Sequence, residues 1–208
     1  MSKLVIFLVF VNSVSLCYAE YDFIERTHNV RAEYNGVVVD DPCSPGPGPL
    51  SFNFDNGIIS ETGSTDFSPW FMFDKYNTYA EAGSYESDVD FDIQSSISTI
   101  FKPAGDSFEI HTTIYDENWG CRSYVELTDM DDETTVFYAD FFGGSPDGIY
   151  PINPEHIYNL DVHSEVSSLT PDHLYFSLSE VYFAVIPEPC SLSLLALGGL
   201  ALRRKRLL

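Results

Sequence analysis

The sequence has few positive charges. Only 10 of its 208 residues are Lys or Arg, against 32 Asp and Glu, so the formal net charge is −22. Proteins that bind nucleic acid place clustered Lys and Arg against the phosphates, and this composition therefore excludes nucleic acid as a partner. Half of the basic residues also lie near the chain ends. Between positions 20 and 186 only five basic residues accompany 31 acidic ones, a net charge of −26.

Cysteine is also scarce. The chain has four cysteines, and two of them, Cys17 and Cys190, lie in the terminal segments. The other two, Cys43 and Cys121, are predicted to form a disulfide, which requires an oxidising compartment. Such a bond would stabilise the fold by about 4 kcal/mol in the chain-entropy model. The alternative is a pair of unpaired thiols.

Long uncharged apolar runs are confined to the two ends. At the N-terminus, Lys3 precedes an apolar stretch from Leu4 to Leu16 that ends in Cys17-Tyr18-Ala19. A basic start, a short apolar stretch and small residues at the end are typical of a secretory signal peptide. We predict cleavage by signal peptidase after Ala19; the alternative is a buried N-terminal strand.

The C-terminus has three consecutive elements. Ile186-Pro187-Glu188-Pro189 is followed by an uncharged segment, 190–202, and then by the basic cluster Arg203, Arg204, Lys205 and Arg206. The prolines lack a backbone N–H and would end a preceding strand. In lipid the apolar segment must be helical, and the basic cluster would stay on the cytoplasmic side. Thirteen helical residues reach about 20 Å, less than the ~30 Å hydrocarbon core. Snorkelling of the arginines, local thinning of the bilayer or transient anchoring would each reconcile the segment with a membrane.

This order of elements, in a chain that begins with a signal peptide, resembles the sorting signal of PEP-CTERM proteins. The resemblance covers residues 186–208 and implies processing by an exosortase, an integral-membrane enzyme of bacteria that make exopolysaccharide. It also implies that Pro187, Glu188 and Pro189 form the recognition motif and that the tail is removed or exchanged during sorting. The protein would then reach the cell surface or the extracellular matrix. Cys190 departs from the family, which usually has Ser or Thr there.

The central region, residues 20–185, is predicted to be one β domain. Asn35-Gly36 and Asn56-Gly57 each separate two apolar segments, and Asn-Gly favours the type I′ turn of a hairpin. Apolar and polar residues alternate over 88–93 and 108–115, as on a half-buried strand. Further predicted strands are 67–76, 96–101, 123–128, 134–142, 156–162 and 174–185. We therefore predict an all-β fold, an antiparallel two-sheet sandwich that is jelly-roll-like.

One acidic loop is a candidate metal site. Asp129, Asp131, Asp132 and Glu133 lie between two predicted strands, where a loop can fold carboxylates around Ca²⁺. The alternative is a simple charged turn. A bound Ca²⁺ would also stabilise the domain by screening its self-repulsion. No other cofactor is expected.

Motifs for catalysis are lacking. The five histidines have no zinc-protease spacing, and no Gly-x-Ser-x-Gly elbow occurs. Together with the resemblance to PEP-CTERM proteins, this lack predicts a non-catalytic surface or matrix protein that accompanies exopolysaccharide. The alternative is a carbohydrate-binding module, and the third hypothesis is a polysaccharide-degrading hydrolase. For a module, aromatic side chains would form a sugar-stacking platform unless they fill the core; the candidates are Trp70, Phe71, Tyr76 and Tyr79, or Tyr115 and Trp119.

Overall fold

The structure is a computed structural model. It describes residues 21–40, 43–45, 49–55, 59–70, 73–84, 90–117, 120–167 and 173–187. Ala19, Glu188, Pro189 and the basic cluster Arg203, Arg204, Lys205 and Arg206 lie outside these residues, as does the predicted C-terminal helix. Within the described ranges, no helix has the length and hydrophobicity needed to cross a membrane.

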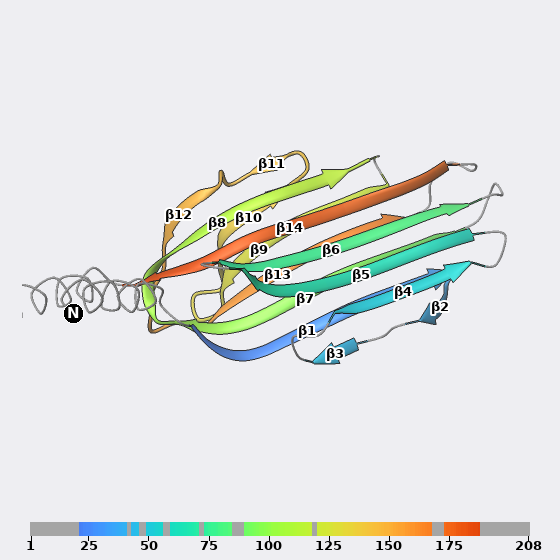
Figure 1. Cartoon of the computed structure of the whole chain (residues 1–208). Helices are drawn as coiled ribbons and strands as arrows, with labels where there is room; N and C mark the ends of the chain where they lie inside the picture. The colour runs from blue at the N-terminus through green and yellow to red at the C-terminus, as the bar shows by residue number, and fades with distance from the viewer. Residues whose placement is uncertain are drawn as a thin grey trace, which may run out of the picture.

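The described residues form two sheets in which every strand pairing is antiparallel (Figure 1). The larger sheet has the order β11 (Gly143–Gly144), β10 (Thr134–Asp140), β9 (Cys121–Asp129), β13 (Tyr158–Ser167), β7 (Phe91–Pro103), β1 (Tyr21–Tyr34) and β2 (Val37–Asp40), and β3 (Cys43–Pro45) also pairs with β1. The smaller sheet has the order β12 (Gly148–Pro151), β8 (Gly105–Asp116), β14 (His173–Pro187), β6 (Phe73–Ser84), β5 (Ile59–Trp70) and β4 (Leu50–Asp55).

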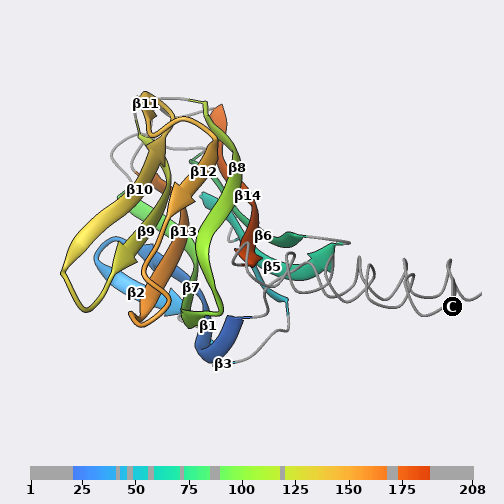
Figure 2. The ribbon, with the colours of Figure 1, turned by 90° about the vertical axis from the view of Figure 1, so that its left-hand side faces the viewer.

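The two sheets lie face to face and enclose the core (Figure 2). Alternate side chains of the long strands are buried, because successive side chains of a strand point to opposite faces. The larger apolar cluster includes Phe101, Phe108 and Phe183. The ring centroid of Phe183 lies 5.4 Å from that of Phe101 and 5.4 Å from that of Phe108. The smaller cluster includes Phe91, Ile93 and Ala82. The sandwich thus has two apolar clusters rather than one.

A layer of small and polar residues lies between these clusters. In the larger sheet the inward-facing residues Ser123, Ser164 and Ser95 are in register on β9, β13 and β7. In the smaller sheet the corresponding row is Asp116, Ser177, Ala80 and Gly63 on β8, β14, β6 and β5. A Cβ at position 63 would lie 2.8 Å from Ser95 Oγ, so glycine permits the close approach of the two sheets here. We call this set the polar layer.

Both ends of the described domain lie at the same end of the sandwich. Tyr21, the first residue of β1, is in register with Pro103, and Pro187, the last residue of β14, with Gly105. Figure 1 shows β1 beginning and β14 ending on the same side. The predicted leader and the predicted sorting segment therefore join the domain next to each other.

Several strand predictions are confirmed. Asn35 and Gly36 have φ values of 47° and 74° and connect β1 to β2, as the predicted hairpin requires. β4 and β5 also pair as a hairpin, although Asn56 and Gly57 lie outside the described residues. The all-β class and the two antiparallel sheets agree with the prediction.

Other boundaries were wrong. The predicted strand 67–76 is two strands, because β5 ends at Trp70, which is in register with Phe73 at the start of β6. Aromatic residues favour strands, and Trp70, Phe71 and Phe73 follow closely in the sequence without the Asn-Gly signal found at position 35. Conversely, the segments 88–93 and 96–101 were predicted as two strands, but residues 91–103 form one strand, β7.

Candidate functional site

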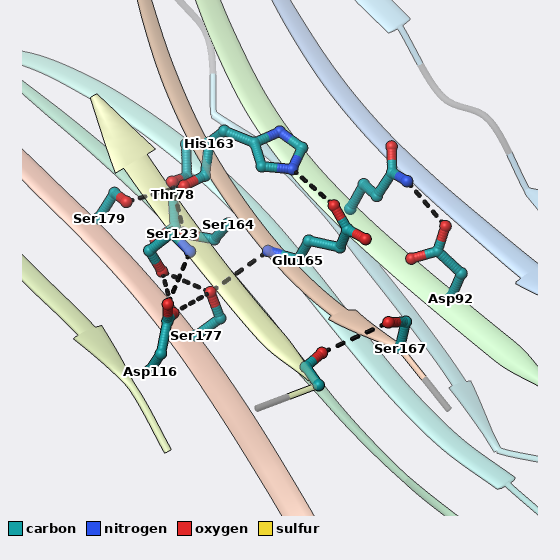
Figure 3. Close-up of polar contacts among 12 residues, drawn as sticks. Thr78, Asp92, Asp116, Ser123, His163, Ser164, Glu165, Ser167, Ser177 and Ser179 are labelled. Atoms are coloured by element: carbon teal, nitrogen blue, oxygen red, sulfur yellow. Dashed lines mark hydrogen bonds and ion pairs between the residues drawn. The ribbon is translucent and has the colours of Figure 1, made fainter. Parts of the chain in front are cut away.

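The polar layer contains a hydroxyl–carboxyl group built from three strands (Figure 3). Asp116 Oδ1 accepts hydrogen bonds from Ser123 Oγ at 2.6 Å and from Ser177 Oγ at 3.0 Å. Asp116 Oδ2 accepts from the Ser123 backbone N–H at 3.0 Å. All three residues are buried. Because a substrate has no access to them, this group serves the fold: it satisfies buried polar atoms that would otherwise destabilise the interior.

A histidine–carboxylate pair lies on the outer face of the larger sheet. His163 Nε2 is 3.2 Å from Glu165 Oε2 (Figure 3). The His163 ring also stacks on Tyr124 with centroids 4.8 Å apart. The hydrogen bond from His163 holds the pKa of Glu165 below its usual range. The Glu165 backbone N–H also donates to Ser177 Oγ at 3.3 Å. Through its backbone, Glu165 thus connects the strand that carries this pair to Ser177 of the polar layer.

The acidic loop predicted to bind metal forms a corner with the loop that precedes β13. Asp129 Oδ1 accepts from the backbone N–H groups of Asp131 at 3.0 Å and Asp132 at 3.2 Å, which folds the β9–β10 turn. Asp129 Oδ2 lies 2.8 Å from His156 Nδ1. Asp131 Oδ2 accepts from the Ile157 N–H at 2.7 Å. We call Asp129, Asp131, Asp132 and His156 the Asp–His corner.

The protonation of this corner follows from the close His156–Asp129 contact. Burial works to raise the pKa of Asp129, but the hydrogen bonds from His156 and from the backbone lower it overall. The same bond to Asp129 raises the pKa of His156. The pair therefore favours an ionised carboxyl beside a protonated imidazole, and it ties the two loops together.

The corner fits Ca²⁺ poorly. The ligand atoms of Asp129, Asp132 and His156 lie within 4.8 Å of one another. They offer two carboxylates and one nitrogen, whereas Ca²⁺ takes six to eight oxygen ligands. Asp131 and Glu133, which the sequence included, do not belong to this close group. His156 was missed because it comes from a separate loop, 24 residues beyond Asp132.

Calcium is still expected to raise the unfolding temperature, because it screens the repulsion among the acidic side chains. Thermal unfolding of the full chain in Ca²⁺ and in chelator measures this effect. Sodium chloride at equal ionic strength and the variant Asp132→Ala are the controls. An increase that Asp132→Ala abolishes would place the ion at the corner, whereas an increase that salt reproduces would show general screening. An unchanged midpoint contradicts the calcium hypothesis.

Aromatic side chains gather toward the end of the sandwich opposite Tyr21 and Pro187. Tyr115 of β8 stacks on Phe176 of β14 with centroids 5.0 Å apart, and Tyr79 of β6 lies 6.1 Å from Phe176. Phe141, which follows β10, packs edge-on against Tyr115 at 6.2 Å and against Phe142 at 5.6 Å. We call these five residues the distal aromatic patch.

The turn after β10 positions two of these rings. Asp140 Oδ1 accepts from the Phe142 N–H at 2.9 Å, and Asp140 Oδ2 accepts from the Tyr138 hydroxyl at 3.1 Å. Gly143 and Gly144 follow with φ values of 140° and 133°, which side chains other than glycine rarely adopt. The two glycines let the chain reverse, and the phenylalanines remain on the surface, 46% and 71% exposed.

The predicted aromatic candidates have different locations. Tyr76 is buried in the larger apolar cluster, where it fills the core. The sequence-based prediction assigned Tyr79 and Tyr115 to separate groups and did not include Phe176. In the fold, both tyrosines lie next to Phe176. Phe71, Trp119 and the side chain of Trp70 lie outside the described residues.

The predicted disulfide stays a prediction. Cys121 is buried in the smaller apolar cluster, and the backbone of Cys43 pairs with Asn29 on β3. The Cys43 side chain lies outside the described part of the chain.

Comparison with known protein families, curated proteins and solved structures finds no match to this sequence.

Proposed function

We propose that this protein is an exported, non-catalytic surface or extracellular-matrix protein that an exosortase sorts through its C-terminal signal. The observation that carries the proposal is the position of Tyr21 and Pro187 at one end of a closed sandwich. The two predicted processing segments join the domain there. A chain held at this end presents its opposite end, which carries the distal aromatic patch, away from the attachment.

The absence of catalysis is part of the proposal. The hydroxyl–carboxyl group of Asp116, Ser123 and Ser177 lies between the sheets. His156 is engaged by Asp129 at the β9–β10 turn, and His163 by Glu165 of its own strand. These contacts support a structural role for these groups. The hydrolase hypothesis therefore ranks third.

The finer description of the fold and its processing also belongs to the proposal. We assign the sandwich to a jelly-roll-like topology, residues 190–202 to a short helix that anchors the precursor transiently in the inner membrane, and Ala19 to the signal-peptidase site. Exosortase and signal peptidase are the processing partners. A carbohydrate-binding module is the second candidate, and the distal aromatic patch is the observation that favours it.

Altering the sorting motif is expected to trap the protein in the inner membrane. In the double variant Glu188→Ala/Pro189→Ala the apolar segment and basic cluster remain, but the motif that the resemblance assigns to exosortase is lost. Fractionation of the native host, with detection by antibody, measures the distribution. The wild type and the control Glu109→Ala are expected in the surface or matrix fraction. Release of the double variant to the surface at the wild-type level would contradict the proposal.

A further inference from the structure

The distal aromatic patch lies far from the attachment end of the domain. Phe176 is eleven residues before Pro187 on β14, which corresponds to about 35 Å along the strand. Leu178 of β14 is in register with both Tyr115 and Tyr79, so the patch crosses three neighbouring strands of the smaller sheet. A ligand on this surface would therefore rest on a rigid part of the fold.

The exposed area of the patch is too small for a stable contact with a second copy of the chain. Tyr115, Phe141 and Phe142 are 43%, 46% and 71% exposed. At roughly 200 Å² for each aromatic side chain, they offer about 300 Å². A stable protein interface needs about 800 Å² on each partner. Two copies, each with a central charge near −26, would also repel one another.

The charge around the patch excludes an anionic ligand. Acidic residues lie next to the rings: Glu81 accepts a hydrogen bond from the Tyr79 hydroxyl, and Glu117 donates its backbone N–H to the Phe176 carbonyl at 3.2 Å. Asp140 accepts from the Phe142 N–H. The five basic residues of the described domain have partners outside the patch: Arg26 with Phe67, Arg31 with Glu33, Lys75 with Glu180, Lys102 with Glu155, and Arg122 with Tyr124. A phosphate, sulfate or uronate would meet carboxylates without a neighbouring cation.

We propose that the distal aromatic patch binds a neutral polysaccharide. The apolar C–H faces of its sugar rings would pack on Tyr115 and Phe141, and its hydroxyl groups would donate to carboxylates such as Glu117. Apolar surface with a few oriented polar groups is the usual composition of a small-ligand site. This inference rests on the second candidate function, for which it names the ligand class and the site, and it does not depend on export and sorting.

Affinity electrophoresis of the full chain in mild detergent tests the proposal. Native gels would contain hydroxyethylcellulose, xyloglucan or a soluble β-1,3-glucan as neutral polymers, and alginate as the anionic polymer. The wild type is expected to be retarded by at least one neutral polymer and not by alginate. Tyr115→Ala and Phe141→Ala are each expected to weaken binding at least tenfold, while Tyr115→Phe, which keeps the ring, retains it.

The matched control is Ile149→Ala, which removes an apolar side chain that is 64% exposed on β12, outside the patch. It is expected to bind like the wild type. Unfolding midpoints of all variants separate lost binding from lost folding. Three results would each overturn the proposal: no retardation in any neutral gel, equal retardation of the alanine variants and the wild type, or patch-dependent self-association in place of glycan binding. None of them bears on the sorting proposal, which fractionation tests separately.

Discussion

Replacing Glu61 with Gln is expected to flatten the dependence of stability on pH. Glu61 lies on β5, is fully buried, and neither carboxyl oxygen has a hydrogen-bond partner among the described residues. Its in-register neighbours are Ala82 and Phe54, which belong to or pack on the smaller apolar cluster. Burial, with a smaller contribution from the charge of Asp92, raises the pKa of Glu61 to about 8.

The sign of the effect follows from proton linkage. Below pH ~4.5 the carboxyl is protonated in both states, and above pH ~8 it is ionised in both. Between these values only the folded protein binds the proton, so stability falls as pH rises, by about 1.4 kcal/mol per pH unit. The total loss from Glu61 between pH 5 and pH 8 is on the order of 4 kcal/mol.

Urea unfolding of the wild type and Glu61→Gln at pH 5 to 9 measures this loss. Gln keeps the shape of the protonated acid and has no proton to release in this range. The variant is expected to match the wild type near pH 5 and to exceed it at pH 8. Glu155→Gln, whose side chain is 84% exposed, is the control and should follow the wild type. Parallel curves for the wild type and Glu61→Gln would show that Glu61 is not protonated in the fold.

Removing the Asp116 carboxyl is expected to destabilise the protein by about 3 to 5 kcal/mol. In Asp116→Ala, the Ser123 N–H and the hydroxyls of Ser123 and Ser177 lose their acceptor between the sheets. Each buried polar group without a partner costs about 1 to 3 kcal/mol. The Ser123–Ser177 hydroxyl contact, at 2.5 Å, remains and offsets part of the loss.

Guanidinium unfolding measures this effect. Asp106→Ala removes an exposed carboxyl from the beginning of the same strand, and it is expected to change stability by less than about 0.5 kcal/mol. A loss of under ~1 kcal/mol in Asp116→Ala would mean that water replaces the carboxyl, and the polar layer would not be a structural requirement of the fold.

The strands could be predicted from the sequence where apolar residues alternate with polar ones and the apolar side chains are the buried ones. Ile110 on β8 and Val181 on β14 follow this pattern. The polar layer could not be predicted, because Ser123, Ser164 and Ser95 are buried at positions where the pattern expects apolar side chains. The hydrogen bonds of Ser123 and Ser164 cross between sheets, and no local rule indicates which strands face each other.

The candidate sites also depend on distant pairings. Asp129 and Asp132 were found as an acidic loop, but His156 joins them only because the loop before β13 folds against the β9–β10 turn. Likewise, Phe176 lies 61 residues after Tyr115, and they meet because β8 and β14 are neighbours. Propensity and spacing identify such residues, whereas sheet topology decides which of them meet.

Mass spectrometry of the protein recovered from the cell surface tests the central claim, export with processing at both ends, most directly. We predict a mature N-terminus at Glu20 and no peptide that contains the basic cluster Arg203, Arg204, Lys205 and Arg206. Surface protein that retains either Met1 or this basic cluster would contradict the account.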